Sequence, residues 1–214
     1  MSSRVSCGAF LAAVISVAFA SNASAQRIEL GATIGAYSPL GSFDRTSVHA
    51  MNLPNGPGDL GGAALGGELR LWIAPRIGLA FAGSTVSSDV GGGIAPGGYR
   101  PPTNARVSEG SAQLLFRVTG DGSRARAWLS AGAGLVNHGG AAYEQFHKPT
   151  NVAGVFGAGS AIRISGGLNA ELGLTTMIYT LNASTPGPPT PYRVSERGRQ
   201  TDLLLRTGLS YTIH

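Results

Sequence analysis

Charge is scarce in this chain of 214 residues. Asp, Glu, Lys and Arg together make up 13% of the sequence, whereas soluble domains usually carry about 25%. Lys148 is the only lysine, so nearly all of the positive charge comes from arginine. Soluble proteins cover themselves with Lys and Glu, and this chain has too little charge to keep its whole surface in water. The arginines form no basic cluster with interleaved aromatic residues, which argues against a nucleic-acid partner.

The chain has a single cysteine, and after its first 25 residues it has no long apolar run. The one cysteine, Cys7, lies close to the N-terminus. A chain that starts at Gln26 therefore has no disulfide, and hydrogen bonds and burial must hold it together. No stretch after the first 25 residues approaches the 18 apolar residues of a transmembrane helix.

The first 25 residues have the pattern of an export signal. Arg4 gives a positive start, Ala9–Ala20 is an apolar run with Ser16 as its one polar residue, and Ala23-Ser24-Ala25 fits a signal-peptidase site. At about a dozen residues, the apolar run is too short to cross a bilayer as a helix. We expect residues 1–25 to be a cleaved secretory signal peptide that directs export across the inner membrane. Residues 26–214 are then a single domain.

Residues for catalysis and metal binding are sparse as well. No two of the four histidines lie three or four residues apart, so metal-ligand spacing is absent; they are His49, His138, His147 and His214. His138 is followed by Gly139 and Gly140, not by the serine of a Ser-His-acid arrangement. The stretch GAGLVN at Gly132 begins like a dinucleotide fingerprint but lacks the third glycine. The sequence predicts no enzyme activity, no catalytic residue, no metal site and no cofactor.

The sequence has instead much glycine and a strong alternation of apolar and polar residues. Glycine accounts for 33 residues, about twice the usual share. Alternation predicts β-strands with one apolar and one polar face. Eight segments of about 10–14 residues show it, longer than average soluble strands and long enough to cross a bilayer. They are Arg27–Ser38, Ala63–Ile73, Arg76–Val86, Glu109–Val118, Arg124–Val136, Val152–Ile164, Leu168–Leu181 and Thr201–His214.

The connections between these segments alternate in length. Three are tight turns: Ala74-Pro75, Thr119–Ser123 and Ser165–Gly167. The other four are long and rich in Gly, Pro, Ser and Asn: Pro39–Gly62, Ser87–Ser108, Asn137–Asn151 and Asn182–Gln200. Alternating short and long connections, with both termini on the short side, are typical of an up-and-down barrel in an outer membrane.

The chain resembles the small OmpA-, OmpX- and OmpW-like outer-membrane barrels. It shares with them a signal peptide, eight alternating segments, three tight turns and four long loops. The last segment resembles the C-terminal assembly signal of such proteins, except that His214 follows Tyr211 and Ile213. The resemblance implies an all-β fold: an eight-stranded antiparallel transmembrane barrel with short periplasmic turns and long extracellular loops. It further implies a location in the bacterial outer membrane, and as partners the barrel-assembly machinery, outer-membrane lipid and lipopolysaccharide.

The polar faces of the segments carry five acids and five arginines. Acids and arginines can balance inside a narrow barrel, where small residues and paired charges fit and an unpaired charge costs several kcal/mol. We expect an internal charge network centred on six residues: Glu68, Arg70, Arg117, Arg163, Glu171 and Arg206. Structural filling of the barrel and a constriction on a solute path are both compatible with such a network.

The apolar faces are expected to meet lipid, with Phe81, Phe116, Phe156 and Tyr211 among them. Trp72 and Trp128 fall on the inward parity instead, so they either fill the interior or are turned outward by a bulge.

Three functions are compatible with this pattern. The one we expect is an integral outer-membrane protein with a structural or surface-interaction role and no catalysis, because an eight-stranded barrel is filled by its own side chains. The loop stretch Tyr143–Lys148, which combines aromatic and charged residues, is the candidate contact for a surface partner. The alternatives are a narrow channel for small or apolar solutes and a soluble, lipocalin-like barrel with its apolar face inward.

Overall fold

The computed structural model describes most of the expected barrel. The described residues are 27–40, 61–90, 93–95, 98–100, 103–120, 123–140, 150–183 and 196–213. Within these ranges, no helix is long and apolar enough to cross a membrane. The expected signal peptide, the loop stretch Tyr143–Lys148, and His49, His147 and His214 lie outside the described residues.

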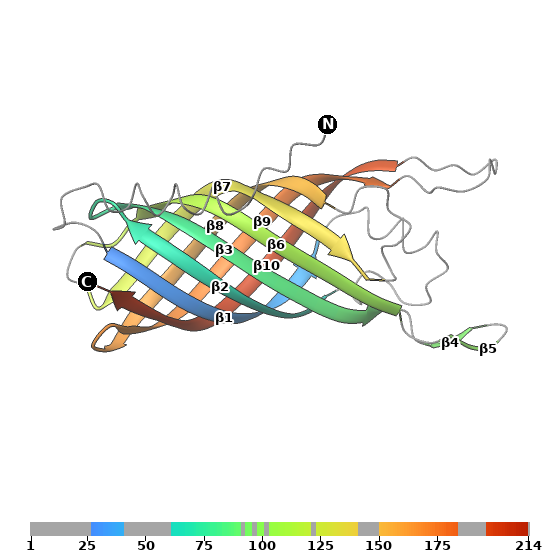
Figure 1. The fold of residues 1–214 in the computed structure, drawn as a ribbon, viewed down its shortest axis with the longest axis horizontal. Coiled ribbons are helices and arrows are strands. Elements are labelled where there is room, and N and C mark those ends of the chain that lie inside the picture. Colours follow the sequence, from blue (N-terminus) through green and yellow to red (C-terminus); the bar gives the residue numbers. More distant parts are fainter. Residues whose placement is uncertain are drawn as a thin grey trace, which may run out of the picture.

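Eight long strands close into one antiparallel barrel in the order β1-β10-β9-β8-β7-β6-β3-β2 (Figure 1). The strands are β1 (Arg27–Pro39), β2 (Gly62–Trp72), β3 (Ile77–Val90), β6 (Thr103–Arg117), β7 (Ala125–Gly139), β8 (Thr150–Ser165), β9 (Leu168–Ala183) and β10 (Glu196–Ile213). The predicted fold, an eight-stranded antiparallel barrel, is confirmed.

Closure depends on the pairing of the first and last strands. β1 pairs with β10 from Ile28↔Ile213 to Pro39↔Asp202, and its other edge pairs with β2. All eight strands therefore have two hydrogen-bonded neighbours, so the barrel has no free sheet edge. Because successive side chains alternate between faces, each strand contributes one row to the lumen and one to the outside.

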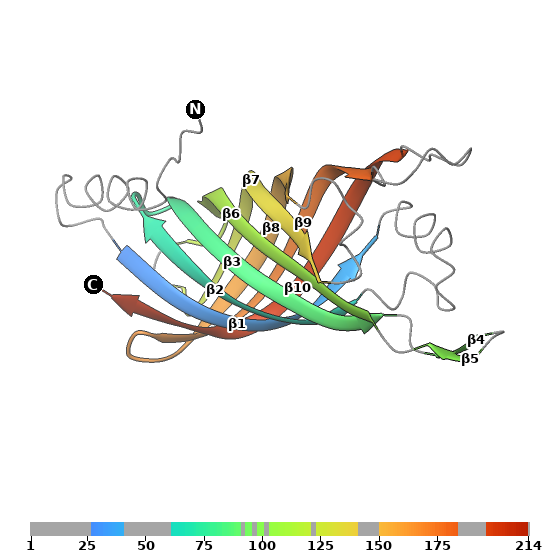
Figure 2. The same cartoon turned by 45° about the vertical axis from the view of Figure 1, so that its right-hand side comes forward.

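The described turns lie at one end of the barrel, which we call the short-turn end. Between β2 and β3, Ala74 N donates to Ile77 O at 3.1 Å and Ile77 N donates to Ala74 O at 3.3 Å. Between β8 and β9, Gly166 has a φ of +53°, a backbone conformation that glycine adopts without strain. The chain's C-terminus is also at this end, whereas β4 and β5 lie beyond the opposite, long-loop end (Figures 1 and 2).

The long connection expected at Ser87–Ser108 is shorter than predicted. β3 continues to Val90, β6 starts at Thr103, and the strands pair along this extension, for example Ser88↔Ala105. Between them, β4 (Gly93–Ala95) and β5 (Gly98–Arg100) form a separate two-stranded hairpin. The apolar alternation ends earlier because this part of the strands carries serines and other polar residues on its outer face, so the sequence pattern underestimates strand length.

The outside of the barrel is a broad apolar belt. Its large side chains are about half exposed or more, and Val152 is 73% exposed. Members of the belt include Leu30, Ile34, Leu65, Leu114, Phe116, Leu129, Leu135, Phe156, Ile162, Leu172, Leu205, Leu209 and Tyr211. Toward the long-loop end the outer row becomes polar: Asn137 Nδ2 donates to Thr150 Oγ1 at 2.7 Å, and Arg106 and Arg199 are exposed.

Candidate functional site

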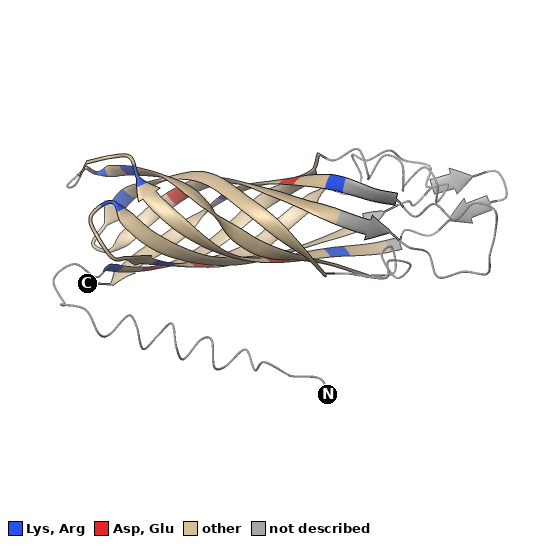
Figure 3. Ribbon diagram, turned by 90° about the horizontal axis from the view of Figure 1, so that it is seen from above, with Lys and Arg blue, Asp and Glu red and all other residues tan. Residues whose placement is uncertain are grey.

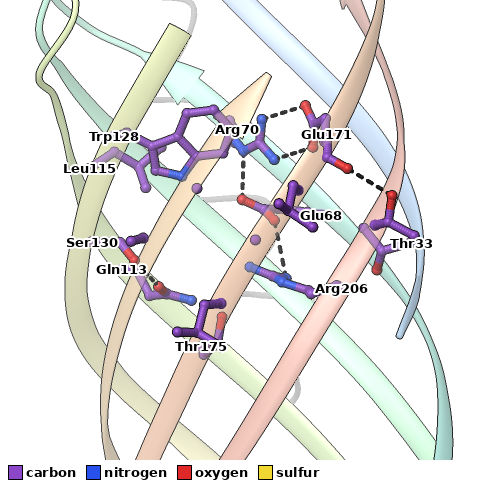
Figure 4. A pocket seen from close by; sticks show the side chains of 16 residues that line it. Thr33, Glu68, Arg70, Gln113, Leu115, Trp128, Ser130, Glu171, Thr175 and Arg206 are labelled. Carbon is purple, nitrogen blue, oxygen red and sulfur yellow. Dashed lines mark hydrogen bonds and ion pairs between the residues drawn. The ribbon is translucent and has the colours of Figure 1, made fainter. Parts of the chain in front are cut away.

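The interior of the barrel holds buried charged groups, and Arg70 is the centre of the largest group. Its Nη1 and Nη2 donate to Oε1 and Oε2 of Glu171 at 2.7 and 2.5 Å, a bidentate pair. Its Nε donates to Glu68 Oε1 at 2.6 Å, and Nη1 also reaches Glu29 Oε2 at 3.3 Å. Figure 4 shows the guanidinium between the two carboxylates of Glu68 and Glu171, beside the Trp128 ring. One arginine thus contacts three carboxylates from three different strands.

Two of these carboxylates, Glu68 and Glu29, also contact further arginines. Glu68 Oε2 lies 3.2 Å from Nη1 of Arg206 on β10. Glu29 Oε1 accepts a hydrogen bond from Arg126 Nη1 and lies 3.1 Å from Arg27 Nε. Glu29, Glu68 and Arg126 are all nearly fully buried. A buried charge is tolerated only when it is paired and hydrogen-bonded, and sharing carboxylates among several arginines meets that requirement.

Two tryptophans fill the lumen around this network. Arg70 Cζ stands 4.3 Å from the ring centroid of Trp128, and Arg117 Cζ stands 4.2 Å from that of Trp72. Both tryptophans are buried, so of the two placements open from the sequence they take the interior one. A Cβ on Gly159 would lie 2.5 Å from the Trp128 ring, so the glycine provides the space that the indole occupies.

The space left around this network is small. A cavity of about 10 Å³ lies among Arg206, Gln113, Thr175, Ser130 and their neighbours, enough for about one water molecule. Gln113 Oε1 accepts from Ser130 Oγ at 2.7 Å. The short-turn half of the lumen is therefore packed with side chains.

A layer of mostly apolar side chains lies in the lumen between the charged half and the long-loop end. On β10, Leu204 stands between Arg206 and Asp202; on β7, Val136 stands between Ser130 and His138. The layer is a cluster of buried side chains that includes Tyr37, Ala64, Val86, Val107, Val136, Ala153, Val155, Met177 and Leu204. No polar row runs through it from one half to the other along these two strands.

A second polar group lies at the long-loop end of the lumen. The Tyr179 hydroxyl donates to Asp202 Oδ2 at 2.7 Å, and Gln200 Nε2 donates to Asp202 Oδ1 at 3.0 Å. His138 Nε2 is 3.0 Å from the same hydroxyl; since that hydroxyl gives its one proton to Asp202, Nε2 is the donor in this contact. All four side chains are buried.

The structure brings four of the six predicted network residues into one group: Glu68, Arg70, Glu171 and Arg206. Arg117 is buried at the same end and stacks on Trp72. Arg163 does not join them. It is exposed, because the strand pairing shifts between Arg163 and Ser165 and the buried inward row of β8 ends at Ala161.

Sequence reasoning left Glu29 and Arg126 out of the centre of the network, although both belong to it. Both residues occupy positions on the polar face of their segments, and this pattern could have indicated that they belong to the network. The Tyr179–Asp202–His138 group was not predicted, because its members come from three strands and lie up to 64 positions apart by their residue numbers (202 minus 138). Within the described residues, no three His, Cys, Asp or Glu side chains are placed to hold a metal ion.

Comparison with known proteins places the fold. No family model matches the sequence, and no curated protein is significantly similar to it. The structure is similar to that of outer membrane protein OprG from Pseudomonas aeruginosa, with 11% sequence identity over 89% of this chain and 97% of OprG and a TM-score of 0.58. It is also similar to Neisserial surface protein A, with 11% identity over 89% and 99% of the two chains and a TM-score of 0.51. The fold is that of the eight-stranded outer-membrane barrels.

Proposed function

We propose that the protein is an integral outer-membrane barrel with a structural or surface-interaction role and no catalysis. The arrangement of apolar and charged residues is the observation that carries this proposal. The belt leaves residues such as Val152 and Leu172 exposed on the outside, while seven charged side chains of the described strands are buried: Glu29, Glu68, Arg70, Arg117, Arg126, Glu171 and Asp202. A soluble protein has the opposite distribution, with charged groups outside and apolar groups inside. An apolar outer surface is stable in the hydrocarbon of a membrane.

The filled lumen favours a closed barrel over a narrow channel. A solute would have to displace the Arg70–Glu171 pair, both tryptophan stacks and the apolar layer around Leu204 and Val136. Breaking a buried ion pair alone costs about 3–5 kcal/mol. The same filling argues against a soluble, lipocalin-like barrel, because the cavity beside the network holds about one water molecule and is lined by polar groups such as Arg206, Gln113 and Thr175.

The long-loop end is the side that we assign to partners. The polar outer row near Asn137 marks where the belt ends, and the long connections start beyond it. A loop-mediated surface partner and lipopolysaccharide would meet the protein there, and the barrel-assembly machinery would insert it. The stretch Tyr143–Lys148 remains the candidate contact.

Two measurements test this proposal. Cell fractionation should place the protein in the outer membrane, and unboiled protein should migrate differently from boiled protein on a gel, because a closed barrel resists detergent. Purified barrels in a planar bilayer should give no steady unit current. Recovery in aqueous extract without detergent would overturn membrane insertion, and steady unit currents would favour the channel.

A further inference from the structure

Five arginines gather around the opening of the lumen at the short-turn end. Figure 3 shows the blue segments concentrated at this end of the barrel. We call the five residues the arginine mouth: Arg27, Arg117, Arg124, Arg126 and Arg163. Arg117 and Arg126 are buried, whereas Arg124 and Arg163 are exposed at the rim. Arg76 adds a further exposed charge in the adjoining turn.

In the part of the chain that the structure describes, the arginine mouth has fewer carboxylates than guanidinium groups. Among the described residues, Glu29 is the carboxylate that contacts them, and Arg27 and Arg126 converge on its single oxygen Oε1. Glu68 and Glu171, one layer deeper, are occupied by Arg70 and Arg206. Asp121, outside the described residues, supplies one further negative charge in the sequence of the neighbouring turn, which still leaves arginines in excess.

Arg126 carries donors that nothing in the described structure satisfies. Its side chain is only 5% exposed, and its Nε and Nη2 have no hydrogen-bond partner. A buried, charged donor without an acceptor is costly. No described residue supplies the acceptor that these donors need, so an anion from outside could satisfy them.

Arg124, which directly precedes β7, stands opposite Arg163 near the end of β8. Arg163 N donates to Arg124 O at 3.0 Å, and Arg124 Nε donates to Arg163 O at 3.3 Å. Neither forms an ion pair with a described carboxylate. Like charges placed opposite one another across two strands destabilise the sheet, and an anion between the two guanidinium groups would turn that repulsion into attraction.

We propose that the arginine mouth binds a tetrahedral oxyanion, a phosphate or a phosphate ester group. The planar fork of arginine matches the oxygen pairs of phosphate in a bidentate way. The buried Trp72 and Trp128 stacks lie behind the mouth, so the anion would bind at this end without passing through the lumen. The proposal depends on the barrel fold but not on the membrane in which the barrel sits.

The test uses full-length protein refolded in a neutral detergent and a phosphate-free chloride buffer. Inorganic phosphate, titrated by calorimetry and by thermal unfolding, should bind and raise the midpoint of unfolding through mass action. The double variant Arg124→Gln/Arg163→Gln should bind phosphate at least tenfold more weakly. Both residues are exposed, so this variant keeps the buried network. Arg199→Gln, an exposed arginine near the opposite end, is the matched control and should bind as the native protein does.

A second arm identifies the source of the phosphate. The barrel is reconstituted in phosphatidylcholine vesicles with a trace of spin-labelled phosphatidic acid, and the immobilised fraction of the label is measured with and without the double substitution. Arginine-dependent binding of either probe supports the proposal, and the comparison shows whether free phosphate or a lipid head group is preferred. Absence of binding to both probes, or an equal loss in Arg199→Gln, would overturn it. Gel mobility of unboiled protein is read on the same samples, so loss of the barrel itself is distinguished from loss of binding.

Discussion

Arg70 and Glu171 join two strands that are not neighbours in the sheet. Arg70 is on β2 and Glu171 on β9, with β1 and β10 between them in the barrel order. Their two hydrogen bonds, 2.7 and 2.5 Å long, therefore cross the lumen. Such a pair fixes the shape of the closed barrel from within, because its geometry is satisfied only when four strands keep their relative positions.

Removing one member of this pair should destabilise the barrel strongly. Glu171→Gln leaves Arg70 with less negative charge in a buried site, and the expected loss in free energy of unfolding is about 3 kcal/mol or more. Glu109→Gln is the control, since Glu109 is held by a hydrogen bond from Ser84 at 2.6 Å, and its loss should be about 1 kcal/mol. Urea unfolding in lipid vesicles measures both. Equal losses would contradict a special role for the cross-lumen pair.

Glycine at position 159 should be required by the neighbouring indole. Gly159→Ala brings a methyl group against Trp128, and overpacking of this kind costs about 1–3 kcal/mol. The tryptophan emission should also change, because Trp128 is one of only two tryptophans. Gly110→Ala is the control, since a Cβ there meets nothing within 4 Å. If both variants unfold at the same urea concentration, Trp128 is not packed as described.

The Tyr179 hydroxyl should stabilise the long-loop end of the lumen. Tyr179→Phe removes the bridge between His138 and Asp202, and leaving buried polar groups short of a partner costs about 1–3 kcal/mol. Tyr211→Phe tests the same change at a side chain that is 57% exposed, where little effect is expected. Urea unfolding of the two variants in the same vesicles gives the comparison. A neutral Tyr179→Phe would show that the buried bridge contributes no stability.

The sequence was sufficient for the barrel because the strand pattern is local. Alternation depends on neighbouring residues, and turn length is read directly from the chain, so the strands and the order of short and long connections could be predicted. The strand ends were less well predicted, as at Val90 and Thr103, because polar residues outside the apolar belt carry no alternation.

The interior contacts depend on how strands far apart in sequence face one another across the lumen. The alternation of side chains along each strand placed Arg70, Glu171 and Arg206 inside the barrel. It could not show which carboxylate each arginine contacts. Parity also placed Arg163 inside, and the structure leaves it exposed, because inward direction near a strand end does not guarantee burial. The contacts of Tyr179 with His138 and Asp202 depend on how three strands are aligned in the closed barrel. The pattern within a single segment does not give this alignment.

The contact between the apolar belt and lipid can be measured directly with spin labels on single cysteines in a Cys7→Ser background. A label at Leu172, in the belt, is compared with one at Asn137, in the polar row outside it, after reconstitution in vesicles. The account predicts that oxygen, which dissolves in lipid, relaxes the Leu172 label and that a water-soluble nickel chelate relaxes the Asn137 label. Equal relaxation of both labels by the nickel chelate would contradict it.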